Sequence, residues 1–287
     1  MNDKRSKTAR EFYPAALTIA GNDPSGGAGI AADLRTFNAF GVYGTCVITA
    51  LTAQNPKTVS AVTIEADSVV AGEISSVMDA CPLSFAKTGM LGSGSIVKTV
   101  ADAIRKYNLQ VICDPVMIST SGKSLLAADA VDILKNELLP QTAWITPNIP
   151  EAEHLADCRI SSENDMCECA LKLHKRYNAS IILKGGHNLQ SDEATDIVCR
   201  AGKLYRLISP AIDTPPYASH GTGCTFSAAL TAGLVLKYPW KQALCEAKSF
   251  VFGSLAQSVE LANGLHAMYP PTEDCYNQIR LEEIKTI

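Results

Sequence analysis

The sequence predicts an α/β fold in which helices cover both faces of a mostly parallel β-sheet. Short, nearly continuous apolar runs alternate with amphipathic helical stretches along most of the chain. Runs of that composition are typical of strands buried on both faces, and their alternation with helices favours right-handed crossovers between parallel strands. Ligands of such folds collect beyond the carboxyl ends of the strands, so polar residues that directly follow a strand are candidates for a functional site.

The predicted elements follow one another from residue 15 onward. The first apolar run reads AALTIA, and later runs of similar composition come after it. The predicted strands cover residues 15–20, 46–51, 84–90, 111–117, 143–148, 180–186 and 196–199. The predicted helices are the amphipathic stretches at residues 95–109, 129–140 and 163–177 and the Ala- and Leu-rich stretch within residues 219–233.

The two ends of the chain differ from the part between them. The first 12 residues, MNDKRSKTAREF, are charged and aperiodic, which predicts a flexible tail. Residues 269–287 are polar enough for a peripheral helix or a frayed end. With 287 residues, 47% of them apolar, the chain can bury a large core as one domain or two small ones, and we favour a single domain over residues 13–287.

The charge and hydropathy of the chain argue against two classes of partner. Lys and Arg number 25 against 29 Asp and Glu, which gives a formal net charge of −4, and no basic cluster marks a nucleic-acid-binding surface. The sequence shows neither an apolar span of about 20 residues nor a signal peptide. We therefore expect a cytoplasmic protein with no nucleic-acid or membrane partner.

The ten cysteines are scattered along the chain rather than arranged as a disulfide framework. Five fall in apolar runs and are expected as small buried hydrophobes: Cys46, Cys81, Cys113, Cys199 and Cys245. The only metal-like cluster consists of Cys158, Cys167, Cys169 and His174. Two cysteines that lie two residues apart on a helix point to different faces, so we do not expect structural zinc.

Two glycine-rich segments resemble phosphate-binding loops but lack a required residue. The sequence SGKS at residues 121–124 would need a glycine five residues before its own glycine to form a P-loop, and Met117 stands there. Lys123 is therefore predicted to be a solvated loop residue. The sequence GAGIAA at residues 27–32 matches the dinucleotide fingerprint loosely, but residues 47–55 supply no acidic residue for a ribose.

A third segment, SHGTGCTFSAALTAG at residues 219–233, is the strongest candidate anion site. Gly221 and Gly223 flank Thr222 at the start of a predicted helix, where free N–H groups and the positive end of the helix dipole attract anions. The glycines let a phosphate group approach the backbone closely. Cys224 is the next side chain, so this position carries a thiol rather than a carboxylate able to take up a proton.

Several motifs together resemble one known family, the hydroxymethylpyrimidine/phosphomethylpyrimidine kinases of thiamine biosynthesis, which belong to the ribokinase-like superfamily. The resemblance runs from about Ala15 to about Ala262 in the family's order and spacing. The motifs that carry it are LTIAGNDPSGGAGIAADLRTF (17–37), VITALTAQN (47–55), KTGML (87–91), DPVM (114–117), TPNIPEA (146–152), LKGGH (183–187) and HGTGCTFSAAL (220–230).

The resemblance implies a ribokinase-like three-layer αβα sandwich that forms a homodimer. It also implies phosphorylation, with ATP and Mg²⁺, of 4-amino-5-hydroxymethyl-2-methylpyrimidine and then of its monophosphate to the diphosphate. Asp33 and Gln54 look like the groups that hydrogen-bond the aminopyrimidine, with Ala28 and Met90 against the ring. A carboxylate and an amide suit the polar edge of such a ring, and a thioether suits its face.

The same resemblance assigns the nucleotide side of the site. Asn148 and Glu151 match the N-x-x-E motif that positions Mg²⁺ and its waters, and Asp114 follows a strand where it could bind the metal or assist ATP. Lys184 resembles the residue that reaches the ATP phosphates. Two carboxylates without histidine are the ligands that Mg²⁺ prefers.

Cys224 stands where most sugar kinases of the superfamily carry an aspartate base. Phosphoryl transfer passes through a loose transition state, so a strong base is optional. We expect the helix N-terminus to lower the pKa of Cys224, which would let it act as a modest base in the first transfer together with the amides of Gly221, Thr222 and Gly223. A neutral thiol would also avoid repelling the phosphate acceptor of the second transfer, whereas a fixed aspartate would not.

Two alternative functions remain open. A pyridoxal kinase or a dual-substrate kinase of the same superfamily is the nearer one, and Gln54 favours the pyrimidine. A nucleotide-binding regulatory protein without catalysis is disfavoured because Asp114, Glu151, Lys184 and Cys224 are all present. The proline-rich segment at residues 212–219 could be either a lid or a rigid approach to the anion site.

Overall fold

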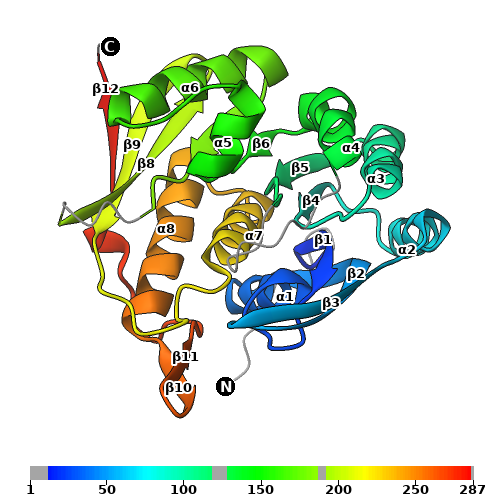
Figure 1. The fold of residues 1–287 in the computed structure, drawn as a ribbon, viewed down its shortest axis with the longest axis horizontal. Coiled ribbons are helices and arrows are strands. Elements are labelled where there is room, and N and C mark those ends of the chain that lie inside the picture. The colour runs from blue at the N-terminus through cyan, green and yellow to red at the C-terminus, as the bar shows by residue number, and fades with distance from the viewer. Residues whose placement is uncertain (1–11, 118–127, 187–191, 286–287) are drawn as a thin grey trace, which may run out of the picture.

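The computed structural model describes residues 12–117, 128–186 and 192–285, and it shows a ten-stranded sheet between two helical layers (Figure 1). The strands of this sheet are β1 (Ala15–Asn22), β2 (Tyr43–Asn55), β3 (Thr58–Ile64), β4 (Phe85–Thr88), β5 (Gln110–Cys113), β6 (Trp144–Ile145), β7 (Ser180–Leu183), β8 (Glu193–Arg200), β9 (Lys203–Pro210) and β12 (Arg280–Ile284). The helices are α1 (Gly29–Ala39), α2 (Asp67–Ala80), α3 (Gly94–Tyr107), α4 (Ala128–Ile133), α5 (Ile149–Ala156), α6 (Glu163–Tyr177), α7 (Thr222–Val235) and α8 (Trp240–Ala256).

The strand order places a topological switch point beside β1. The order across the sheet is β12-β9-β8-β7-β6-β5-β4-β1-β2-β3, and the strands from β7 through β2 in this order are parallel to one another. The chain winds from β1 outward through β2 on one side and from β4 through β7 on the other. In open α/β sheets a ligand crevice forms at the carboxyl ends of the strands where the winding reverses. The predicted mostly parallel α/β sandwich is confirmed.

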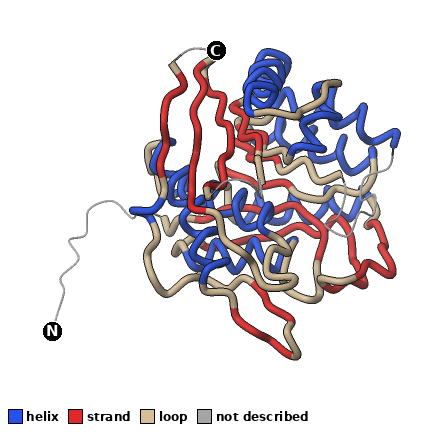
Figure 2. Tube along the Cα trace, turned by 60° about the vertical axis from the view of Figure 1, so that its left-hand side comes forward, coloured by secondary structure: helices blue, strands red, loops and turns tan. Residues whose placement is uncertain are grey.

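Helices α1, α7 and α8 cover one face of the sheet, and α2, α3, α5 and α6 cover the other. Successive residues of β1 show this division, because side chains alternate between the faces of a strand. Leu17 and Ile19 belong to the core under α2 to α6, whereas Ala16 packs with Phe37 of α1 and Ala228 of α7. The tube view shows the small hairpin of β10 (Val259–Ala262) and β11 (Leu265–Ala267) projecting from this body (Figure 2).

The predicted strands and helices are confirmed in type and order, but five strands of the described structure were not predicted. Residues 129–140 continue α4 through a π-helical turn at Leu134–Leu138 and a 3-10 turn at Leu139–Gln141. The strands that the sequence did not predict are β3, β9, β10, β11 and β12. The expected helix or frayed end at residues 269–287 is wrong, because β12 pairs antiparallel with β9 at the edge of the sheet. Three of its five residues, Arg280, Glu282 and Glu283, are charged and exposed, which is typical of an edge strand.

Two predictions fall largely outside the described residues. They are the flexible tail at residues 1–12, of which only Phe12 is described, and the solvated loop at SGKS with Lys123. Within the described part of the chain, no helix combines the length and apolar character needed to cross a bilayer. All ten cysteines are unpaired; Cys113, Cys199 and Cys245 are buried as expected, and Cys46 and Cys81 are half-buried.

Candidate active site

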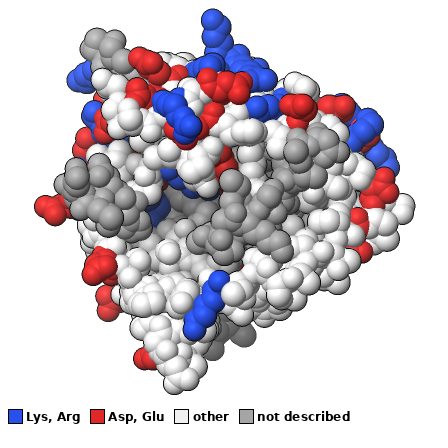
Figure 3. Space-filling model, viewed as in Figure 1, with Lys and Arg blue, Asp and Glu red and all other residues white. Residues whose placement is uncertain are grey.

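A cavity of about 300 Å³ opens beyond the carboxyl ends of the parallel strands, at the switch point of the sheet. The space-filling view shows a hollow near the middle of this face, with basic side chains at its edge (Figure 3). Of the predicted site residues, those that line the cavity are Ala28, Gln54, Met90, Asp114, Asn148, Glu151, Lys184, Gly221, Thr222, Gly223 and Cys224. Six separate segments that follow strands or begin helices therefore meet at one place.

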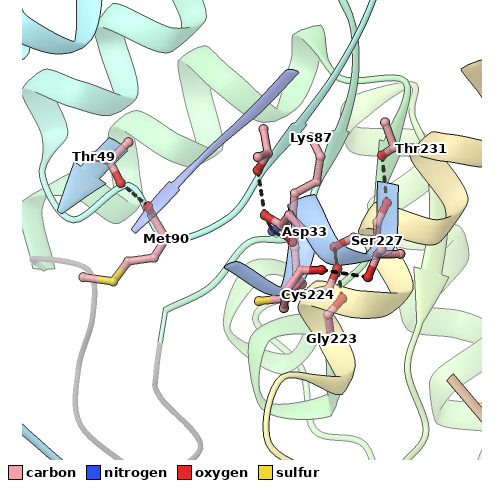
Figure 4. Close-up of polar contacts among 12 residues, drawn as sticks. Asp33, Thr49, Lys87, Met90, Gly223, Cys224, Ser227 and Thr231 are labelled. Carbon is pink, nitrogen blue, oxygen red and sulfur yellow. Dashed lines mark hydrogen bonds and ion pairs between the residues drawn. The ribbon is translucent and has the colours of Figure 1, made fainter. Parts of the chain in front are cut away.

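Asp33 does not line the cavity, contrary to the expectation that its carboxylate lies at the ligand. It lies on the inward face of α1 with no exposed surface, and Lys87 of β4 donates to its two carboxylate oxygens at 2.8 and 3.0 Å. Thr18 of β1 donates a third hydrogen bond at 2.6 Å (Figure 4). Because an isolated buried charge is strongly disfavoured, the two ions hold each other in the interior.

Burial acts on both partners of this pair. It raises the pKa of Asp33, with Lys87 opposing. Burial alone would lower the pKa of Lys87, but Asp33 outweighs it and raises that pKa, so the lysine stays charged. Lys87 was overlooked in the motif KTGML, although a lysine within an apolar strand needs a buried anion as its partner.

The turn before α7 has the geometry of an anion-binding site. Gly221 caps the helix in the left-handed region, at a φ of 83°, and a side chain there would collide with the carbonyl oxygen of Gly27. Only glycine allows this contact between the α7 turn and the β1–α1 loop. The Thr222 N–H donates to the Ser219 carbonyl at 3.3 Å, whereas the next N–H groups, of Gly223 and Cys224, lack acceptors within the helix and belong to residues that line the cavity.

The Cys224 thiol is less acidic than its place at a helix start predicts. Burial raises its pKa, and Asp33 and Asp114 add to the rise, while Lys87 and a hydrogen bond from the Gly29 N–H oppose it. The expected lowering of this pKa is therefore wrong, because loss of hydration outweighs the nearby cation. The close-up view shows Cys224 near the Asp33–Lys87 pair, with Met90 on the opposite side of the view (Figure 4). The Thr49 hydroxyl donates a hydrogen bond to the Met90 carbonyl at 2.6 Å. Cys224 is neutral at neutral pH.

Lys184, Asp114 and Glu151 form a charged cluster on the other side of the turn. Lys184 Nζ donates to Asp114 Oδ1 at 2.8 Å, and the Cα of Gly223 packs so closely on this pair that a side chain at position 223 would touch both groups. Asp114 is 3% and Glu151 5% exposed. Burial raises the pKa of Glu151 to about 7, with Lys184 opposing and Asp114 adding to it.

The N-x-x-E motif is also the N-terminal capping box of α5. Asn148 Oδ1 accepts from the Glu151 N–H, and Glu151 Oε2 accepts from the Asn148 N–H, both at 2.9 Å. Such a box satisfies backbone donors at a helix start. The same two side chains therefore fix the start of α5 and line the cavity.

A second cavity of about 170 Å³ adjoins the first and shares Lys184, Gly186, Thr222 and Gly223 with it. Its walls are mainly apolar and come from β9, α7, α8 and the segment after β9: Pro210, Ile212, Phe226, Val251, Phe252 and Leu255. The buried pair of Lys248 and Asp196, 2.7 Å apart, lies at one side. The sequence reading named none of these residues, although the helical pattern of α8 was present as a signal.

The sequence profile of the family described as phosphomethylpyrimidine kinase matches residues 23–269 of this chain, which include the whole cavity lining except three residues of β1. The chain belongs to this family. The hydroxymethylpyrimidine/phosphomethylpyrimidine kinase of Escherichia coli is 43% identical over 255 residues, covering 87% of this chain and 94% of that protein. The chain spans about half the length of two other curated relatives and more than nine-tenths of several more.

Solved structures extend the likeness of this phosphomethylpyrimidine kinase family member to a neighbouring group. The pyridoxal kinase of Staphylococcus aureus in complex with AMP-PCP has a TM-score of 0.85 at 28% identity, over 96% of this chain and 100% of that chain. The phosphomethylpyrimidine kinase of Clostridium difficile has a TM-score of 0.73 at 37% identity, over 83% of this chain and 97% of that chain. The fold is therefore that of the ribokinase-like kinases.

A further hydrogen-bonded pair in this family member links two residues that lie 197 positions apart in the chain. The sequence analysis did not predict this pair. Asp23, directly after β1, accepts a hydrogen bond from His220 Nε2 at 2.8 Å, and both residues line the first cavity. Burial opposes the charge on Asp23, but the hydrogen bonds from His220 and Ser25 outweigh it and lower the pKa to about 2 from 3.8. The position of Asp23 after a strand was a usable signal, but nothing local pointed to His220.

The low pKa of Asp23 predicts a loss of stability in acid. Because the folded-state pKa lies below the unfolded value, the carboxylate stabilises the folded chain above about pH 4, by about 2 kcal/mol, and this contribution disappears as the pH falls to about 2. Asp23→Asn should remove that part of the pH dependence, as measured by urea unfolding at pH values between about 2 and 6. An unchanged slope in the variant would show that Asp23 carries no such free energy.

Proposed function

We propose that this protein transfers the γ-phosphoryl group of ATP to the hydroxymethyl oxygen of 4-amino-5-hydroxymethyl-2-methylpyrimidine and then to the resulting monophosphate. Family membership supplies the reaction class. The observation that carries the proposal is that two cavities of different character meet at Lys184, Thr222 and Gly223. A donor in one and an acceptor in the other would bring their reacting groups together at the N-terminus of α7.

The second cavity suits the nucleotide. Its apolar walls, with Phe226 and Phe252 among them, match the flat surface of a base, and Lys184 with the α7 turn stands where phosphates would lie between the two cavities. The amides and the lysine are fixed in place before a ligand binds. Catalysis of phosphoryl transfer depends mainly on such positioning and charge neutralisation.

Glu151 and Asp114 fit a hydrated Mg²⁺. The two buried carboxylates carry one more charge than the Lys184 beside them, and Asp114 adds to the rise that burial causes in the pKa of Glu151. Mg²⁺ prefers few carboxylates together with water and phosphate oxygens. When bound, it would neutralise charge on the ATP phosphates; Asn148 would hold Glu151 in place through the capping box.

The first cavity suits the pyrimidine. Gln54 at the end of β2 lines it, and among the described residues its amide makes no hydrogen bond, so both its donor and its acceptor are free for a ring edge. The Met90 side chain and Ala28 offer apolar surface to the faces of a flat ring. The neutral Cys224 thiol would then lie beside the acceptor without repelling a phosphate there.

Pyridoxal kinase activity is the second candidate, because the S. aureus pyridoxal kinase has a higher TM-score than the C. difficile phosphomethylpyrimidine kinase. A coupled ATPase assay with hydroxymethylpyrimidine, its monophosphate and pyridoxal separates the two. We expect turnover with both pyrimidines and little with pyridoxal, and loss of turnover in Lys184→Met. Turnover with pyridoxal alone would overturn the main proposal, and no turnover with any acceptor would overturn both.

We further propose that residues 13–287 form one kinase domain that works in the cytoplasm as a homodimer. Ten unpaired cysteines suit a reducing compartment. Tyr43 and Leu51 of β2 and Ile64 of β3 expose apolar side chains at one end of the sheet, which supports pairing with a second copy there. One chain has a mass of 30.6 kDa, and light scattering should give twice this value. Leu51→Lys should halve the measured mass.

A further inference from the structure

Asp196 of β8 connects two other elements that meet at the second cavity. Its Oδ1 accepts a hydrogen bond from the Gly185 N–H at 2.9 Å, and its Oδ2 accepts one from Lys248 Nζ of α8 at 2.7 Å. The side chains of Asp196 and Lys248 are 8% and 11% exposed. Because charges buried to this extent are stable only when they are paired, each of the two groups holds the other in place.

The hydrogen bond to Gly185 places Lys248 at the end of the second cavity that adjoins the first. Gly185 lies between Lys184 and Gly186, and both of these neighbours line both cavities. The Lys248 ammonium is separated from this loop by one carboxylate group, that of Asp196. Two lysines, one after β7 and one on α8, are therefore held at the junction of the two cavities.

Helix α8 lines the second cavity with one cation followed by three apolar side chains. Lys248, Val251, Phe252 and Leu255 have the spacing of residues that share one face of a helix, and all four line the cavity. A helix rises 1.5 Å per residue, so the apolar part extends about 10 Å beyond the cation. A nucleotide with its phosphates at the junction would place its base against this apolar part.

Lys248 can bind a phosphate oxygen while Asp196 holds it. An ammonium group has three N–H donors, and among the described residues only Asp196 accepts a hydrogen bond from Lys248. The lysine stem is flexible, so a free lysine loses conformational entropy when its ammonium is fixed on a ligand. An ammonium that is already anchored on one side avoids most of this loss, which strengthens binding.

We propose that Asp196 is a positioning residue for the donor nucleotide, which it serves by holding Lys248 where the phosphates bind. This inference rests on the nucleotide site of the proposed function. Asp196 itself does not bind the phosphates, because its negative charge would repel them. Its effect on the nucleotide is transmitted through the lysine, and the acceptor substrate in the first cavity does not depend on it.

Titration calorimetry with ADP tests the proposal. Asp196→Asn keeps the size of the side chain and an oxygen that accepts from Gly185, but it removes the charge that anchors Lys248. We expect the Kd for ADP to rise about tenfold to a hundredfold, which corresponds to one hydrogen bond to a charged group. Lys248→Met should raise it at least as much. The double variant should match Lys248→Met, because the two residues act as one unit.

Steady-state kinetics separates positioning from a general structural effect. Asp196→Asn should raise the KM for ATP and leave the KM for the acceptor unchanged. Asp33→Asn is the matched control, because it also removes the charge of a carboxylate paired with a buried lysine, but Asp33 lines neither cavity. The control should lower the free energy of unfolding and leave the Kd for ADP unchanged.

The double variant also serves if Asp196→Asn does not fold, because the pair is then neutral and no buried charge lacks a partner. A Kd for ADP equal to that of Lys248→Met would support the proposal, whereas a weaker affinity would show that Asp196 acts independently of the lysine and would overturn it.

An unchanged Kd for ADP in Asp196→Asn would overturn the inference. Equal rises in the KM for ATP and the KM for the acceptor would also overturn it and make Asp196 a purely structural residue. These results would leave the proposed function intact, provided that the unmodified protein binds ADP. If the unmodified protein does not bind ADP, the nucleotide site and this inference both fail.

Discussion

Cys224→Asp should phosphorylate hydroxymethylpyrimidine but lose about 10³-fold of its activity toward the monophosphate. A carboxylate about 4 Å from an acceptor phosphate would repel it by about 4 kcal/mol at an effective dielectric constant near 20, which corresponds to about three orders of magnitude in rate. The unmodified thiol avoids this repulsion because burial raises its pKa and keeps it neutral. The measurement is the initial rate of each half-reaction at saturating ATP.

Cys224→Ser is the matched control for that experiment. The hydroxyl is also neutral and of similar size, so both half-reactions should change by similar factors. Turnover of the monophosphate by Cys224→Asp at the unmodified rate would show that the charge at position 224 does not matter. A large loss of the second reaction in Cys224→Ser would assign the effect to the sulfur rather than to charge.

Lys87→Met should destabilise the folded protein by about 3–5 kcal/mol, the range found when one partner of a buried ion pair is removed. Both side chains of the pair are 0% exposed, so the change leaves the Asp33 carboxylate without its cation in the interior. Urea unfolding gives the free energy directly. Removal of Lys87 should also raise the pKa of the Cys224 thiol further, because Lys87 opposes the rise that burial causes.

Two companion variants isolate the cause of that loss. Lys87→Met combined with Asp33→Asn removes both charges and keeps an acceptor for Thr18, so most of the stability should return. Lys98→Met removes an exposed lysine that lies 3.6 Å from Asp102, and such pairs contribute less than about 1 kcal/mol. Equal stability of the single and double Lys87 variants would contradict the role assigned to the buried charge.

The fold and most of the cavity lining could be predicted because both follow from local patterns. Apolar runs marked the central strands, and the family resemblance supplied Asp114 and Gln54, both of which the structure places at the carboxyl ends of strands. The edge strand β12 was missed for a physical reason: three of its five residues are charged and exposed, so it shows no apolar run. Its existence depends on pairing with β9, which the sequence of the strand does not express.

The sequence contained a signal for the buried position of Asp33 that the prediction did not use. Asp33 shares the inward face of α1 with Ile30 and Phe37, spaced three and four residues away, and this periodicity marks a buried position. Lys87 in the apolar strand β4 was the matching sign of a buried partner. The Asp23–His220 pair differs, because contact between residues so far apart in the chain depends on how α7 packs against α1. The pKa of Cys224 depends on burial in the same way.

The backbone contact between Gly221 and Gly27 makes the spacing of the phosphoryl-transfer groups independent of the side chains that surround the ring. Since main-chain atoms set the distance from the acceptor loop to the amides of α7, replacement of side chains around the ring leaves that distance intact. Gln54 and Met90 can therefore diverge freely while the transfer machinery stays the same. This modularity offers a reason why vitamin kinases with different ring substrates share one scaffold, and why exchange of a few wall residues is a realistic route to a new acceptor.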